Sequence, residues 1–286
     1  MTDFNDKTLL LGIGAQKAGT TWLSSFLNGH ADVFMSPIKE LNYWNMLHVP
    51  EIRPIQEAYF LSQMKRMSAG ITSYSEVLNK SPRYKQLVNY IERFEMASTD
   101  DYMNFFQKRV GAQKIMCEIT PGYALLSAEH YEEMYKLHPS VKIIFIMRDP
   151  IDRYWSNLRF YQKLMKNFDA KENFVRRLSD KPYYQRTDYA RTMVELEKSV
   201  PAEDRLYLFY EDLFTQASID KVTQFIGVPS EKADFDREVN KSPSIPISEE
   251  EQKLAYDQFA SIYKKLHDKF EGKLPKRWLE NMEKFG

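Results

Sequence analysis

The stretch 9-LLLGIGAQKAGTTWLSSFLN-28 decides the local structure on which the rest of the chain depends. Its first five residues are apolar and have the length of a buried strand, and its last seven carry apolar side chains at helical spacing. Between them lies the loop 14-GAQKAGTT-21. A loop that leads from a strand into a helix presents free N–H groups and the positive end of the helix dipole. The stretch therefore predicts an anion-binding loop, to which Lys17 adds charge and Thr20 and Thr21 add hydroxyl donors.

The two glycines of this loop have the spacing of a Walker A motif, G-x-x-x-x-G-K-[ST]. The residue after the second glycine is Thr20, however, and the loop lysine stands three positions earlier as Lys17. An ATPase or GTPase without the usual lysine would hold its β- and γ-phosphates poorly, whereas a loop for another anion would not be impaired. The alternative is an ordinary strand–turn–helix in which Gly14 and Gly19 serve packing alone.

The composition limits the classes of function. The chain has 286 residues, of which 43% are apolar, and its 40 basic side chains balance 40 acidic ones. A net charge of zero argues against a nucleic-acid partner or a polybasic membrane surface, although it permits a local basic pocket. No stretch approaches the ~20 apolar residues of a membrane span, and the polar N-terminus is not typical of a signal peptide. Because Cys117 is the single cysteine, no internal disulfide can form, and we expect a reducing, cytoplasmic location.

Strand patterns alternate with helix patterns along the chain. Apolar runs predict strands at 9–13, 33–35, 114–117, 141–147 and 205–210. Such alternation indicates an α/β fold, a three-layer sandwich with a central parallel sheet and a P-loop-like phosphate-binding loop. We expect a single domain over 1–286, with a mainly helical insertion at about 46–110.

The ligand crevice of a parallel sheet lies at the carboxyl ends of its strands. Five charged residues follow predicted strands at this edge: Lys17, Glu40, Glu118, Arg148 and Glu211. We therefore expect the chemistry among these side chains.

The loop 16-QKAGTTWL-23 resembles the 5′-phosphosulfate loop of sulfotransferases that use 3′-phosphoadenosine 5′-phosphosulfate (PAPS). In that family the loop lysine and threonines grip the 5′-phosphate and the bridging oxygen. The resemblance implies that PAPS is bound by Gln16, Lys17, Ala18, Gly19, Thr20, Thr21 and Trp22. It also implies that Lys17 stabilises the leaving phosphate.

The segment 143-IIFIMRDP-150, followed by 154-YWS-156, resembles the 3′-phosphate motif of the same family. There a strand delivers an arginine, and the following helix delivers a serine eight residues later. Arg148 and Ser156 occupy those positions, and a charged fork with a hydroxyl donor suits a phosphate monoester. Taken alone, Arg148 would rather be expected to pair with a neighbouring carboxylate.

The segment 39-KELNYW-44 resembles the acidic loop of the glycan-type members, where the glutamate is the catalytic base. The resemblance implies that Glu40 is the base, with His48 and Glu118 in reserve. The alternative is a surface Glu40 paired with Lys39.

Two further segments resemble the family in part. Residues 117–123 resemble a segment that often carries a lysine where Ile119 stands, so no catalytic lysine is carried over there. Residues 240–242 resemble the start of a C-terminal segment, but the basic loop that closes over the cofactor has no convincing match after them.

Taken together, the motifs are similar to those of PAPS-dependent sulfotransferases, closer to the glycan and bacterial type. The resemblance implies in-line sulfuryl transfer from PAPS to a hydroxyl or amine of a small-molecule or carbohydrate acceptor. We expect no metal, because the five histidines lack metal-ligand spacing. Two alternatives remain open: a P-loop small-molecule kinase with Asp149 as magnesium ligand, and a PAP- or PAPS-binding module without catalysis.

Overall fold

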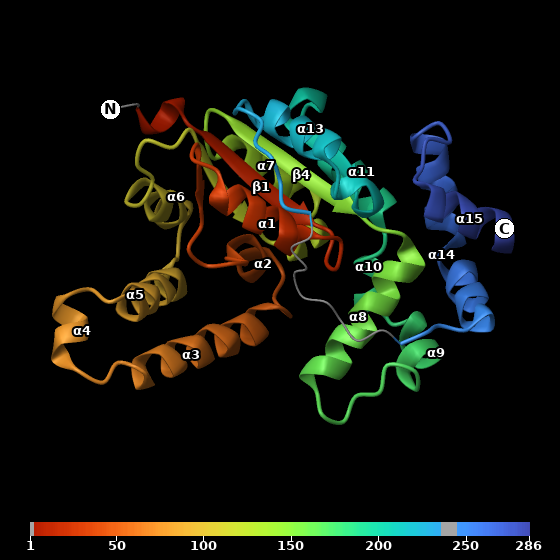
Figure 1. Cartoon of the computed structure of the whole chain (residues 1–286), viewed down its shortest axis with the longest axis horizontal. Coiled ribbons are helices and arrows are strands. Elements are labelled where there is room, and N and C mark those ends of the chain that lie inside the picture. Colours follow the sequence, from red (N-terminus) through yellow and green to blue (C-terminus); the bar gives the residue numbers. More distant parts are fainter. Residues whose placement is uncertain (1–2, 236–244) are drawn as a thin grey trace.

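A parallel five-stranded sheet forms the centre of the computed structural model, which describes residues 3–235 and 245–286 (Figure 1). The strands are β1 (Thr8–Gly14), β2 (Val33–Met35), β3 (Ile115–Ile119), β4 (Val141–Met147) and β5 (Arg205–Phe209). Their spatial order is β2-β3-β1-β4-β5, and every neighbouring pair is parallel. The predicted α/β fold with a central parallel sheet is thereby confirmed.

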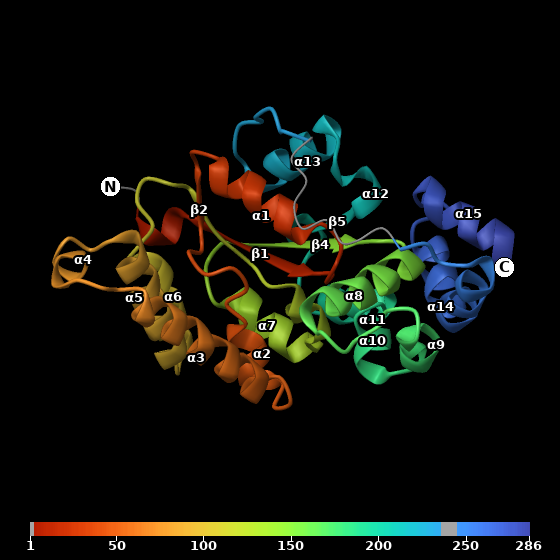
Figure 2. The same cartoon turned by 60° about the horizontal axis from the view of Figure 1, so that its bottom comes forward.

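Helices cover both faces of the sheet and so make three layers (Figure 2). One face carries α1 (Thr20–Gly29), α12 (Tyr210–Leu213) and α13 (Gln216–Ile226). The other carries α2 (Tyr43–His48), α7 (Ala128–Lys136), α8 (Pro150–Leu164), α9 (Asn173–Leu178), α10 (Lys181–Gln185) and α11 (Tyr189–Glu197). Beyond α8 and α9 lie α14 (Glu249–Lys269) and α15 (Lys276–Phe285). Within the described ranges, the search for a helix long and apolar enough to cross a membrane finds none.

The segment between β2 and β3 is helical. After α2 it forms α3 (Arg53–Ala69), α4 (Tyr74–Leu78), α5 (Pro82–Glu95) and α6 (Thr99–Gln107). Helices α3 and α5 pack against each other, and together with α4 they project past the edge of the sheet (Figure 1). Short 3₁₀ helices occur at Phe4–Asp6, Pro121–Leu125 and Ala202–Asp204.

The sheet's core follows from the apolar runs in the sequence. In β1 and β4, side chains such as Leu9, Leu11, Ile143 and Phe145 are fully buried, as expected for central strands covered on both faces. Burying one such side chain contributes about 1.5–3 kcal/mol. Because β1 lies between β3 and β4, the loop that follows it opens in the middle of the carboxyl edge.

Strand β3 ends two residues later than the sequence predicted. The ladder with β1 continues until Gly12 pairs with Ile119, so Glu118 lies inside the sheet and not in the crevice. A carboxylate can occupy a strand interior only when hydrogen bonds replace its water. Tyr102 and Tyr123 donate such hydrogen bonds from neighbouring elements. No local sequence pattern around Glu118 indicates them.

Candidate active site

The loop between β1 and α1 is shaped by a glycine with a positive φ. Gly19, the N-cap of α1, has φ 84°, and a Cβ atom there would lie 2.7 Å from Leu213 Cδ2 and 3.1 Å from the Tyr210 ring. Only glycine fits this conformation and this close approach without strain. The helix starts at Thr20, and the Trp22 and Leu23 N–H groups both donate to the Gly19 carbonyl oxygen. The N–H groups of Thr20 and Thr21 have no partner within the helix and lie at the carboxyl edge of the sheet.

Lys17 lies in this loop in a left-handed conformation, with φ 71°. Its carbonyl oxygen accepts a hydrogen bond of 3.2 Å from Arg148 Nη1, and its ammonium group lies 4.2 Å from the centre of the Phe160 ring. Burial and, after it, the charges of Arg148 and Lys39 together lower the pKa of Lys17 to about 8, against the opposing charge of Glu40. Lys17 is thus a cation whose surroundings do not neutralise it.

Arg148 extends the positive charge at this edge. It follows β4, and its guanidinium lies 4.2 Å from the centre of the Tyr210 ring. Its Nε atom is buried without a hydrogen-bond partner among the described residues. Arg159 lies nearby on α8. Burial lowers its pKa, and the charge of Arg148 lowers it further. Cations gathered at a helix N-terminus form a site for a multiply charged anion.

Glu40 lies at the carboxyl edge, five residues after the end of β2. Its side chain is 40% exposed, and Oε1 lies 3.6 Å from Lys39 Nζ. Lys39 Nζ also donates a 2.7 Å hydrogen bond to Thr21 Oγ1, which links the acidic loop to the phosphate-binding loop. The ion pair with Lys39 that the sequence allowed is therefore present. Exposed ion pairs contribute little free energy, so this pair holds Glu40 only weakly and its carboxylate stays accessible.

The structure separates Glu118 from these residues. Glu118 is buried, and its carboxylate accepts hydrogen bonds from Tyr102 (2.7 Å), Tyr123 (2.8 Å) and Thr120 (3.2 Å). Burial raises its pKa, although these donors act in the opposite direction. The expectation that Glu118 lies in the crevice as a reserve base is wrong, because its oxygens are already occupied inside the sheet.

His48, the other reserve base, is engaged where α2 meets α7. Its ring stacks on that of His130 with centres 3.9 Å apart, and Nε2 lies 3.0 Å from Glu133 Oε2. Burial and the neighbouring His130 lower the pKa of His48, and Glu133 opposes them. These contacts assign His48 a packing role between two helices.

Asp149 lies at the start of α8. It is the N-cap, as an aspartate directly before Pro150 indicates, and its side chain accepts a 3.0 Å hydrogen bond from the Asp152 N–H. It also accepts hydrogen bonds from Tyr263 (2.6 Å) and Asn281 (2.9 Å) and is fully buried. With both oxygens occupied, this carboxylate is not placed to hold magnesium, so the kinase alternative loses its proposed ligand.

Ser156 is buried on α8, in a part of the helix that packs on several sides. The apolar pattern of Ile151, Trp155 and Leu158 predicts that Ser156 lies off the buried stripe of the helix, and this is wrong. Phe160, one helical turn after Ser156, lies over Lys17, so this side of α8 faces the loop between β1 and α1. Arg159 is only partly covered.

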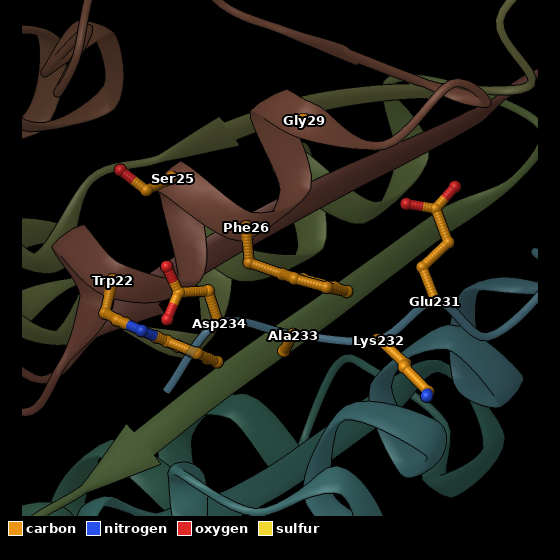
Figure 3. Close-up of a pocket in the computed structure, with 8 residues that line it drawn as sticks. All are labelled: Trp22, Ser25, Phe26, Gly29, Glu231, Lys232, Ala233 and Asp234. Carbon is orange, nitrogen blue, oxygen red and sulfur yellow. The ribbon is translucent and has the colours of Figure 1, made fainter. Parts of the chain in front are cut away.

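A pocket of about 220 Å³ lies beside α1 (Figure 3). It is lined by Trp22, Ser25, Phe26, Gly29, Glu231, Lys232, Ala233 and Asp234. At its edge the Trp22 and Phe235 rings lie nearly parallel, at 18°, with centres 5.7 Å apart. The Phe26 ring also lies nearly parallel to that of Trp22, at 8°, and Trp22 is buried, so its ring packs mainly against other aromatic side chains.

Four residues of this region were not identified from the sequence. Arg159 and Phe160 lie on the side of α8 that faces Lys17. They come three and four residues after Ser156, so helical spacing could have indicated them. Tyr210 directly follows β5 at the same carboxyl edge. No sequence pattern around Asn42 indicated a role for it in the site. Residues 240–242 lie outside the described residues.

The geometry defines an α/β protein with a basic cluster at a strand–loop–helix junction and a carboxylate nearby. The sequence model of the sulfotransferase family matches residues 10–232, which is most of the chain. The chain therefore belongs to the sulfotransferase family. No curated protein sequence matches it significantly. Among the described residues, no group of three or more His, Cys, Asp or Glu side chains is arranged to hold a metal ion.

Solved structures show the same fold. A sulfotransferase from Alicyclobacillus acidocaldarius is 18% identical and superposes with a TM-score of 0.65 over 94% of this chain and 97% of that one. The sulfotransferase domain of the curacin biosynthetic pathway is 15% identical, with a TM-score of 0.50 over 89% and 97%.

Proposed function

We propose that the protein transfers a sulfuryl group from PAPS to a hydroxyl or amine of a small-molecule or carbohydrate acceptor. The observation that carries this proposal is the approach of Arg148 and Lys39 to Lys17 at the N-terminus of α1, where their charges lower the pKa of Lys17. Membership of the sulfotransferase family supports the reaction class. A phosphosulfate is an anion that this cluster would stabilise.

The residues present fit PAPS as the co-substrate. Lys17, with the first-turn N–H groups and the hydroxyls of Thr20 and Thr21, would hold the 5′-phosphosulfate, and Gln16, Ala18 and Gly19 would supply the surrounding loop. The buried, unpartnered Nε of Arg148 is a donor suited to the 3′-phosphate, with Ser156 as the second donor proposed from the sequence. Trp22, which the sequence also assigned to the cofactor loop, is buried among the Phe26 and Phe235 rings and would support the loop from behind.

The chemistry then needs two groups from this chain. The acceptor oxygen or nitrogen attacks sulfur, and the bond between sulfur and the bridging oxygen breaks. The electron pair leaves with that oxygen, whose growing charge the Lys17 ammonium would stabilise. The acceptor proton would pass to the Glu40 carboxylate. A binding module without catalysis would need no base here, so the presence of the Glu40 carboxylate near Lys17 favours the enzyme.

A screen of alcohols, phenols, sugars and amines with ³⁵S-labelled PAPS tests this function. We expect labelled product with at least one acceptor, and the same rate with and without EDTA. Transfer that requires magnesium and ATP would favour the kinase instead. Tight PAP binding without transfer to any acceptor or to water would favour the binding module.

The 3′-phosphate should contribute to binding through Arg148. Replacing Arg148 with alanine removes a charge-assisted hydrogen bond worth about 1.5–3 kcal/mol. Calorimetry should show this loss for adenosine 3′,5′-bisphosphate and almost none for adenosine 5′-phosphate. Equal affinities of the wild type for the two nucleotides would contradict the assignment of Arg148.

The reaction should depend on pH through Lys17. Because the pKa of the free Lys17 ammonium is about 8, its charge is present below that pH and is lost above it. The value of kcat/KM for PAPS should therefore fall as the pH rises through about 8. In kcat the same fall should come at higher pH, since a bound anion raises the pKa of the lysine.

A Lys17→Arg variant provides the control for this profile. Arginine stays protonated over the whole range, so the fall near pH 8 should vanish even if the overall rate is lower. An unchanged fall in that variant would assign it to another group.

A further inference from the structure

The backbone around Glu40 adopts a conformation that needs outside support. Glu40 has φ 61° and Asn42 has φ 51°, so two non-glycine residues within three positions are left-handed. Residues other than glycine adopt this conformation at a cost in free energy, and asparagine tolerates it better than most. Strain of this kind persists only where the surrounding structure fixes it.

Asn42 supports the loop from within. Its Nδ2 donates to the Glu40 carbonyl oxygen at 3.1 Å and to Gln56 Oε1, on α3, at 3.3 Å. Its Oδ1 accepts a 3.2 Å hydrogen bond from Asn45 on α2. This buried amide therefore ties the backbone of Glu40 to two helices of the segment between β2 and β3.

Arg93 supports the next peptide group from α5. Its side chain is 2% exposed, and Nε donates a 2.5 Å hydrogen bond to the Leu41 carbonyl oxygen. The guanidinium lies 5.0 Å from the centre of the Phe60 ring, and Nη2 contacts Met46 Sδ at 3.0 Å. A buried cation held on several sides has little freedom to move, so it fixes the Leu41 carbonyl.

The buried Glu118 completes this support from the sheet. Thr120 Oγ1 donates to Glu118 at 3.2 Å and accepts from the Asn42 N–H at 3.4 Å. Glu118 and Arg93 are both buried, and their opposite charges stabilise each other. The peptide groups after Glu40 and Leu41 are thus held between a buried anion and a buried cation.

We propose that Asn42 and Arg93 are positioning residues that hold the Glu40 carboxylate where it can take the acceptor proton. The inference rests on the proposed function. A general base works only within hydrogen-bond reach of its proton, and a displacement of about 1 Å can cost 10²-fold in rate. With the carbonyls of Glu40 and Leu41 fixed, the side-chain torsions of Glu40 are the main freedom left to it.

Asn42→Ala and Arg93→Met test this inference on an alcohol acceptor found in the ³⁵S screen. Each should lower kcat by about 10- to 100-fold, in line with the cost of misplacing a base, while the Kd for PAP stays within about twofold. Asn42→Gly relieves the backbone strain but does not restore the lost hydrogen bonds. Its kcat should therefore lie between those of Asn42→Ala and the wild type. Arg93→Lys, which keeps the charge and one donor, should recover part of the loss caused by Arg93→Met.

Lys80→Ala is the matched control for a structural effect. Lys80 is also a left-handed non-glycine residue, with φ 48°, and lies in an exposed turn between α4 and α5. The substitution should lower Tm through the same backbone mismatch and leave kcat unchanged. If Asn42→Ala behaves like Lys80→Ala, with a lower Tm and wild-type kcat, the positioning role is overturned.

A double-mutant cycle shows whether Asn42 acts through Glu40. In a Glu40→Gln background, Asn42→Ala should lower kcat by less than about twofold, because the base it positions is already absent. Fully additive losses would overturn the inference while leaving the sulfotransferase proposal intact. A wild-type protein that transfers nothing to any acceptor or to water would overturn the proposed function first.

Discussion

Glu40→Gln should lower kcat by about 10²–10⁴, which corresponds to about 3–5 kcal/mol of barrier. The substitution keeps the shape of the side chain and removes its basicity, so the Kd for PAP should barely change. The reason is that the acceptor proton leaves during transfer and not during nucleotide binding. Transfer from ³⁵S-labelled PAPS to a weakly acidic alcohol, measured at saturating PAPS, gives the value of kcat.

Glu57→Gln is a close control for this experiment. Glu57 is 41% exposed and pairs with Arg53, much as Glu40 is 40% exposed and pairs with Lys39. It should keep full activity. Near-normal turnover of Glu40→Gln with the alcohol would mean that another residue is the base. A strongly acidic phenol would be a poor acceptor for this test, because it loses its proton with little help.

Lys17→Ala should lower kcat for sulfuryl transfer by about 10²–10³, the usual effect of removing one donor to a developing charge. The KM for PAPS should rise much less. The bridging oxygen gains its charge mainly in the transition state, so an interaction with that charge affects kcat more than binding. Steady-state kinetics with PAPS as the varied substrate separates the two effects.

Lys142→Ala controls for the loss of a lysine that lies over an aromatic ring. Its Nζ lies 4.6 Å from the centre of the Phe225 ring, much as Lys17 lies over Phe160, but Lys142 is at the amino end of β4. Its loss should leave kcat unchanged. A Lys17→Ala variant with normal kcat and only a raised KM for PAPS would count against the leaving-group role.

The parts of the fold that depend on local pattern were predictable. The apolar run at 141–147 became β4 with the same limits, and Asp149 caps α8 as its position before Pro150 indicated. The loop between β1 and α1 was also predictable, because glycines, a lysine and threonines stand between a strand and a helix. Burial, hydrogen bonding and torsional preference act there over a few neighbouring residues.

The parts that depend on distant contacts were not predictable. Arg93 lies 52 residues after Leu41, and nothing local in either segment indicates that they meet. The sequence pattern places Glu118 at the end of a strand, whereas the two tyrosines that donate hydrogen bonds to it come from other elements. A catalytic residue can be proposed from a motif, whereas the groups that hold it in place emerge only from the packing.

The hydrogen bonds to Asp149 bear on how the protein can be shortened. The family match ends at residue 232, yet two of the three donors to this buried carboxylate, Tyr263 and Asn281, come from the C-terminal helices. A chain ended at that boundary would leave the carboxylate next to Arg148 exposed on one side and lacking partners, at a cost of about 1–3 kcal/mol. The limit of detectable sequence similarity is therefore not a safe place to cut, because the proposed nucleotide site is supported from beyond it.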